Sequence, residues 1–183
     1  MTPQIDNQLR VRILPIRLMI FDVDGVLTDG RVIIHDDGSE TKAFDVQDGH
    51  GIKLLQRAGI DVALITGRYC RAVEQRAAGL GINRVHQGIH RKVDAYEKLL
   101  RETSLKDEQV GYMGDDLIDI PVMRRVGWAV AVPNAVSQVL PFAHYVTCAR
   151  GGWGAVREVC DLLLQVQGRW EEVTERYFGS GAL

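Results

Sequence analysis

The chain has 183 residues and a mass of 20.4 kDa, with 22 basic and 24 acidic side chains and a formal charge of −2. Its composition, 46% hydrophobic and 25% charged, is typical of an ordinary globular domain. The near-neutral charge argues against a nucleic-acid partner, because proteins that bind polyanions usually carry a basic excess. Neither a membrane segment nor a targeting segment is expected, and three widely spaced cysteines fit a cytoplasmic protein with free thiols.

Short apolar runs alternate along the chain with segments of helical spacing. This alternation predicts an α/β fold, a Rossmann-like three-layer domain with a mostly parallel sheet. The expected strands cover residues 17–21, 62–65, 84–86, 110–113 and 128–132, and the expected helices cover residues 51–58, 70–78, 92–103 and 117–126.

Two strand-like segments, 31–35 and 41–46, interrupt this pattern on either side of a turn sequence. They predict a β-hairpin that projects from one end of the sheet. The segment from 154 to 178 predicts one or two further helices. The expected division of the chain is an N-terminal extension (1–16), a main domain (17–167) with the hairpin 31–46 inserted, and a C-terminal tail (168–183).

Polar residues follow four of the expected strands. In a parallel sheet, ligands bind at the carboxyl ends of the strands, so these side chains should meet at one edge. Carboxylates gathered there would raise one another's pKa unless a cation lay among them, and Mg²⁺ prefers such oxygen ligands. The residues are Asp22 and Asp24; Thr66, Gly67 and Arg68; Gly88 and Lys92; and Asp115, Asp116 and Asp119.

Charge is distributed unevenly between two stretches that contribute to this edge. Residues 22–48 hold eight acids and two bases, whereas residues 66–92 hold six bases and one acid. One stretch is therefore suited to a metal and the other to an anionic phosphate. Taken singly, Thr66 is better explained as a helix cap, and Lys92 is equally consistent with a solvated surface lysine.

These motifs, in this order, resemble the four signature motifs of the haloacid dehalogenase superfamily, most of whose members are Mg²⁺-dependent phosphohydrolases. The sequences are DVDGVLT at 22–28, TGR at 66–68, Lys92, and GDDLID at 114–119. In finer detail the chain resembles the family of 3-deoxy-D-manno-octulosonate 8-phosphate phosphatases, through FDVDGVLTDG at 21–30 and GGWGAVREVCDLLL at 151–164. That family acts in lipopolysaccharide precursor synthesis.

The resemblance implies a role for each matching residue. Asp22 would be the nucleophile and Asp24 the general acid and base. Asp22, the backbone carbonyl of Asp24, and Asp115 would hold Mg²⁺. The remaining implied roles are metal support by Asp116 or Asp119, phosphoryl binding by Thr66 and Lys92, and substrate contacts by Thr28, Gly67, Arg68 and Gly88.

Arg68 would contact the carboxylate of the sugar acid, although a surface arginine explains it equally well. His86 and His90 are spaced as a metal pair, but no third soft ligand lies near them in the sequence.

Neither gap between the motifs has room for a cap domain, so the site should be open unless a neighbouring subunit covers it. The resembled family forms homotetramers in which neighbouring subunits close the active sites. Residues 31–46 would then serve assembly, and residues 150–154 would form a mobile flap. Trp153 departs from the family pattern, which has a basic residue there.

Two alternatives stay open. The same chemistry could act on another keto-sugar-acid phosphate, such as a nine-carbon one. The chain could instead be a catalytically silent oligomeric scaffold, although its motif set is complete.

Overall fold

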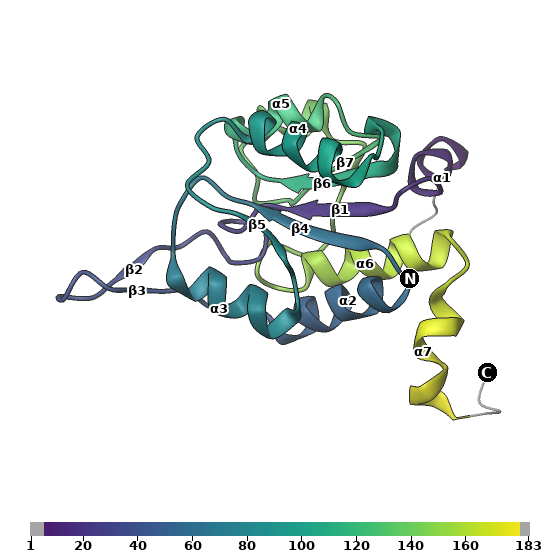
Figure 1. Ribbon diagram of the computed structural model, residues 1–183, viewed down its shortest axis with the longest axis horizontal. Helices are drawn as coiled ribbons and strands as arrows, with labels where there is room; N and C mark the ends of the chain where they lie inside the picture. Colours follow the sequence, from purple (N-terminus) through teal and green to yellow (C-terminus); the bar gives the residue numbers. More distant parts are fainter. Residues whose placement is uncertain (1–5, 180–183) are drawn as a thin grey trace.

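The core of the molecule is a six-stranded, fully parallel sheet with the strand order β5-β4-β1-β6-β7-β8 (Figure 1). The computed structural model describes residues 6–179, so the first five residues of the expected extension and the last four of the expected tail lie outside it. The strands are β1 Leu18–Phe21, β4 Asp61–Ile65, β5 Arg84–His86, β6 Val110–Gly114, β7 Trp128–Ala131 and β8 Tyr145–Val146. The expected α/β class and parallel sheet are confirmed.

Helices cover both faces of this sheet and make it the middle of three layers (Figure 1). On β1, Met19 and Phe21 belong to one buried core cluster, and Leu18 and Ile20 to the other. This is why the strand is apolar at every position rather than at alternate ones. One face carries α2 Val46–Arg57, α3 Arg71–Leu80 and α6 Ala155–Val166, and the other carries α4 Lys92–Thr103 and α5 Ile120–Met123.

Local chemistry places the ends of these helices. The Asp45 side chain accepts a hydrogen bond from the Gln47 N–H and caps α2, which therefore begins before the expected position 51. Gly81 ends α3 in the left-handed conformation, with φ of 68°. The helix expected over 117–126 is wrong as one element: it is a 3₁₀ turn, Leu117–Asp119, followed by the four-residue α5.

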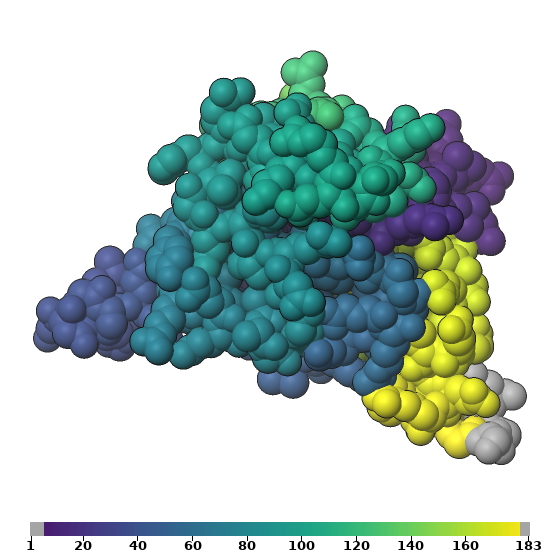
Figure 2. Space-filling model, viewed as in Figure 1, coloured from purple at the N-terminus to yellow at the C-terminus, as the bar shows by residue number. Residues whose placement is uncertain are grey.

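The inserted hairpin projects from the body of the molecule, as expected (Figures 1 and 2). Its pairing is shorter than the sequence predicts, because β2 Ile33–Ile34 pairs only with β3 Glu40–Thr41. Residues 42–45 leave the pairing and lead into α2. Ile34 is 67% exposed at this tip.

Two helices and one short strand complete the chain. The sequence pattern predicted neither the helix α1 Asn7–Ile13 nor the two-residue strand β8. The segment after 154 forms two helices, α6 and α7 Trp170–Phe178, separated by Gly168 at φ of 66°. Helix α7 descends at the end of the molecule opposite the hairpin (Figure 2). None of the helices within residues 6–179 has the length and apolar character needed to cross a membrane.

The strand order changes direction next to β1. The chain runs outward through β4 and β5 on one side of β1, then crosses over to build β6, β7 and β8 on the other. The direction of winding therefore reverses between β1 and β6, and ligands of open α/β sheets bind at the carboxyl ends of such strands. Residues 6–179 include no cap domain over this edge.

Candidate active site

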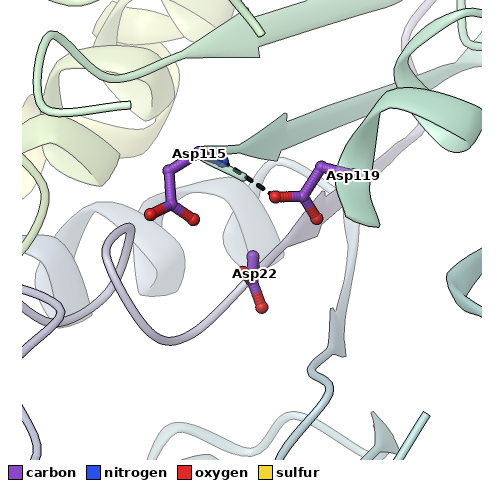
Figure 3. Close-up of side chains that lie close together, drawn as sticks. All are labelled: Asp22, Asp115 and Asp119. Carbon is purple, nitrogen blue, oxygen red and sulfur yellow. Dashed lines mark hydrogen bonds between the residues drawn. The ribbon is translucent and has the colours of Figure 1, made fainter. Parts of the chain in front are cut away.

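Three carboxylates converge at the reversal point of the sheet. Asp22 follows β1, Asp115 follows β6, and Asp119 ends the 3₁₀ turn after β6 (Figure 3). One carboxylate oxygen of each lies within 4.8 Å of the other two. It is the one group of three potential metal-ligating side chains found in the described part of the chain, so His86 and His90 are not part of any such group there.

Asp119 is fully buried, and four donors satisfy its two oxygens. Oδ1 accepts hydrogen bonds from Lys92 Nζ at 2.6 Å and from the Tyr112 hydroxyl at 2.6 Å. Oδ2 accepts from the backbone N–H groups of Asp115 at 2.9 Å and Asp116 at 3.0 Å (Figure 3 draws the first). With every strong acceptor direction in use, this carboxylate is built to hold its neighbours in place.

Lys92 is the cation of the cluster, although it is the first residue of α4, where the helix dipole disfavours a positive charge. Its side chain is 0% exposed, and its Nζ lies 2.9 Å from Asp22 Oδ1 as well as 2.6 Å from Asp119 Oδ1. Burial opposes the charged form, but the two carboxylates outweigh burial and raise the pKa of the lysine. The ammonium is therefore held charged between them.

One lysine does not balance three carboxylates. Burial, followed by the charge of Asp119, raises the pKa of Asp22 to about 7. Burial, followed by the charges of Asp22 and Asp119, raises the pKa of Asp115 to about 8. Asp115 Oδ1 is also buried without a hydrogen-bond partner. A hard divalent cation would supply the missing charge and use the free oxygen, so these residues fit Mg²⁺.

Asp24 lies two residues after Asp22 and has two cations beside it. Its carboxylate pairs with the Lys42 ammonium and lies 3.9 Å from Arg68 Nε. Arg68 in turn pairs with Glu40, whose Oε2 is buried without a partner. The Lys42 side chain is only 1% exposed. The stem of the hairpin thus reaches back over the site of its own chain.

Sequence reasoning missed Lys42, Glu40 and Tyr112. Lys42 and Glu40 lie in a segment assigned only to the hairpin, and Tyr112 sits inside an apolar strand. The available signal for Lys42 and Glu40 was a pair of charges close to the first motif. For Tyr112 it was a hydroxyl two residues before the acidic motif GDDLID.

The two acids left open as metal support occupy different places. Asp116 is exposed and caps the 3₁₀ turn, its side chain accepting from the Leu117 N–H at 2.7 Å. Asp119 lies inside the carboxylate cluster. Asp116 is therefore a turn cap, whereas Asp119 is a buried group that positions its neighbours.

The expected substrate contacts line the same edge. Thr66, which follows β4, is 2% exposed. Its backbone N–H donates to the carbonyl of His86 at the end of β5, and its carbonyl accepts from the Ile89 N–H in the loop that follows β5. Gly88 has φ of 70° and open space where a Cβ would stand. A substrate contact by Thr28 remains a prediction, because its hydroxyl bonds to backbone groups within its own loop, including Gly25 N–H at 3.3 Å.

The expected flap lies against the first motif. The Gly152 N–H donates to Val26 O at 2.9 Å, so the backbone of residues 151–152 is attached to the loop after β1. Trp153 lies beyond this contact and is 68% exposed. Within this segment the two exposed residues are thus Arg150 and Trp153, on either side of the attached glycines.

Comparisons with known proteins agree with this geometry. Residues 85–150 match the model of the haloacid dehalogenase-like hydrolase family. The chain is 53% identical over 159 residues to the 3-deoxy-D-manno-octulosonate 8-phosphate phosphatase KdsC of Yersinia pestis, covering 87% of this chain and 85% of that protein. It is 52% identical over 157 residues to its Escherichia coli counterpart, covering 86% and 84% of the two chains.

A solved structure shows the same fold. The 3-deoxy-D-manno-octulosonate 8-phosphate phosphatase of Moraxella catarrhalis, in complex with magnesium, phosphate and KDO, superimposes with a TM-score of 0.91 at 39% identity. The match covers 93% of this chain and 98% of that one. The chain belongs to the haloacid dehalogenase-like hydrolases, in the family of the 3-deoxy-D-manno-octulosonate 8-phosphate phosphatases.

Proposed function

We propose that this chain is a Mg²⁺-dependent phosphatase that hydrolyses 3-deoxy-D-manno-octulosonate 8-phosphate to the free sugar acid and inorganic phosphate, a step in lipopolysaccharide precursor synthesis. The observation that carries the proposal is the buried Asp22 between Lys92 and Asp115, at the reversal point of the sheet. Relatives of that activity that are more than half identical over most of the chain support the substrate.

The first chemical step places the phosphoryl group on Asp22. An Asp22 oxygen forms a bond to phosphorus while the bond from phosphorus to the sugar oxygen breaks. Asp24 gives its proton to the departing sugar oxygen, so the sugar leaves as a neutral alcohol. Lys92 offsets the negative charge that gathers around Asp22 and the phosphoryl oxygens.

The second step returns the enzyme to its starting state. Asp24, now a carboxylate, takes a proton from a water molecule as the water oxygen attacks phosphorus. The bond from phosphorus to Asp22 breaks and releases phosphate. The ion pairs of Asp24 with Lys42 and Arg68 support a carboxylate that is held in one orientation for this step.

In this proposal Asp22, the backbone carbonyl of Asp24, and Asp115 hold Mg²⁺, while Asp119 holds Asp115 and Lys92 in place. Mg²⁺ supplies positive charge against the phosphate and the acidic cluster when it is bound. Asp116 supports the site indirectly, as the cap of the turn that carries Asp119.

The loops after β4 and β5 complete the proposed substrate site. Thr66, with the backbone at Gly67 and Gly88, is assigned to the phosphoryl oxygens. Arg68 is assigned to the carboxylate of the sugar acid. That assignment requires Arg68 to exchange part of its contact with Glu40 for the substrate carboxylate.

A substrate panel tests the proposal. Phosphate release would be measured with and without Mg²⁺ on the eight-carbon and nine-carbon keto-acid phosphates, hexose phosphates and nucleotides. We expect the highest kcat/KM for the eight-carbon acid. A preference for the nine-carbon acid would replace the named substrate, and no release from any compound would refute the enzymatic function.

The proposal extends to assembly and location. A homotetramer with sites closed by neighbouring subunits is supported by the apolar side chains exposed on the hairpin, Val32, Ile33 and Ile34. A cytoplasmic location is supported by three free cysteines, of which Cys148 is exposed. Sedimentation velocity tests the assembly, and a monomer at working concentration would contradict it.

A further inference from the structure

Asn134 joins two loops that lie far apart in the sequence. It follows β7, and its side-chain amide bonds in two directions at once. Nδ2 donates to the backbone carbonyl of Gly25 at 3.0 Å, in the loop after β1. Oδ1 accepts from the backbone N–H of Gly151 at 2.8 Å, in the segment before α6.

The loops that Asn134 joins are packed without spare room. A Cβ on Gly151 would stand 1.7 Å from the carbonyl oxygen of Gly25. A Cβ on Gly25, which has φ of 86°, would stand 2.0 Å from Asp115 Oδ2. The segment, the loop and the Asp115 carboxylate are therefore stacked in direct contact, and a shift in one moves the next.

The turn after β7 also contacts the end of β6, which is followed by Asp115. The backbone N–H of Val136 donates to the carbonyl of Asp115 at 2.9 Å. The loop contacted by Nδ2 follows Asp24 directly. Residues 134–136 thus contact both halves of the carboxylate site through hydrogen bonds, without belonging to any of the four motifs.

We propose that Asn134 is a positioning residue for the phosphatase reaction, whose amide fixes the loop carrying Asp24 against Asp115 by bridging Gly25 and Gly151. The inference rests on the proposed function for its catalytic readout. An amide suits the position because it donates and accepts simultaneously, whereas an ionised aspartate only accepts and leucine does neither. Small displacements of catalytic groups are costly, about a hundredfold in rate for 1 Å.

Two substitutions at one position test the bridge. Asn134→Leu keeps the approximate volume and removes both bonds. Asn134→Asp keeps an acceptor for the Gly151 N–H and loses the donor to Gly25. We expect kcat to fall at least tenfold in the first variant and less in the second, with KM for substrate changed less than threefold in both.

Mg²⁺ binding gives a readout that does not depend on turnover. Isothermal titration should show Asn134→Leu binding Mg²⁺ at least threefold more weakly than the parent, with Asn134→Asp between them. Circular dichroism and thermal melting establish that each variant is folded. Asn83→Leu, an exposed asparagine just before the amino end of β5, is the matched control and should change neither kcat nor Mg²⁺ affinity.

The outcomes separate the inference from the function. A folded Asn134→Leu variant with kcat and Mg²⁺ affinity within twofold of the parent overturns the positioning role. So does an Asn134→Asp variant that loses as much as Asn134→Leu. If the parent releases no phosphate from any substrate, the proposed function fails, while the Mg²⁺ titration still decides whether Asn134 organises the carboxylate site.

Discussion

Buried carboxylates occur in two regions of this molecule, and the two regions treat them differently. At the contact between α2 and α6, Asp48 is 1% exposed, and its Oδ1 accepts from the Arg157 N–H at 2.7 Å. Gly154, at the N-cap position of α6, has no side chain that could cap the helix, so the Asp48 side chain caps it instead. At the carboxyl edge of the sheet, Asp22 and Asp115 share their surroundings with a third carboxylate, that of Asp119.

The difference lies in how many charges each region must stabilise. Burial raises the pKa of Asp48 only to about 6, because helix N–H groups favour its charged form. At the sheet edge the corresponding values are about 7 and about 8, because like charges add to burial. Asp48 is a single charge that caps a helix, whereas the three clustered carboxylates need a bound cation to balance their charge.

The largest effect is expected when one carboxylate is removed from the cluster. We expect Asp22→Asn to lower kcat by roughly four orders of magnitude, because the amide cannot form the phosphoryl-enzyme. The metal-free variant should melt at a higher temperature than the parent at pH 8, because one buried negative charge is gone. Phosphate release and thermal melting measure the two effects.

Asp61→Asn is the control for this substitution, because Asp61 is exposed at the amino end of β4. It should leave both activity and melting temperature near those of the parent. Retained turnover in Asp22→Asn would remove the covalent mechanism.

The second prediction concerns pH and the metal-free protein. Asp22 and Asp115 have folded pKa values of about 7 and about 8, above the ordinary value of 3.8, so the folded state binds more protons than the unfolded state. The stabilisation of the folded state that these two groups contribute is complete below pH of about 4 and is lost as pH rises through about 8. The slope approaches about 1.4 kcal/mol per pH unit for each group.

Urea unfolding between pH 4 and pH 9 measures this loss. Millimolar Mg²⁺ should reduce it above pH 7, and Mg²⁺ affinity should rise with pH, because binding displaces protons. Calorimetry in two buffers of different ionisation enthalpy counts those protons. No proton release at pH 7 would contradict the placement of the metal among these carboxylates.

The smallest effect is expected at the structural carboxylate. Asp48→Ala should lower the free energy of unfolding by about 1–2 kcal/mol, because α6 loses its cap. Its kcat should change less than about threefold. Asp48→Asn keeps an oxygen acceptor and should lose less stability. A tenfold fall in kcat with either variant would mean that the two regions are functionally coupled.

The sequence predicts the parallel sheet and the meeting of polar side chains at its carboxyl edge, because both depend on local patterns. Apolar runs alternating with helical spacing determine a parallel α/β sheet, and residues after the strands must meet at its carboxyl edge. This reasoning predicts that Asp22, Lys92 and Asp119 lie close together, and Lys92 contacts both carboxylates. Short elements such as β8 and α1 carried too few residues for a periodic signal.

The separate roles of these residues are determined only by the tertiary structure. Asp116 and Asp119 are equivalent as sequence, but folding buries one among four donors and leaves the other exposed as a cap. Lys42 reaches Asp24 because the hairpin stem folds back over the site. Burial and hydrogen-bond satisfaction are properties of contacts between distant segments, so residue type and spacing alone do not determine them.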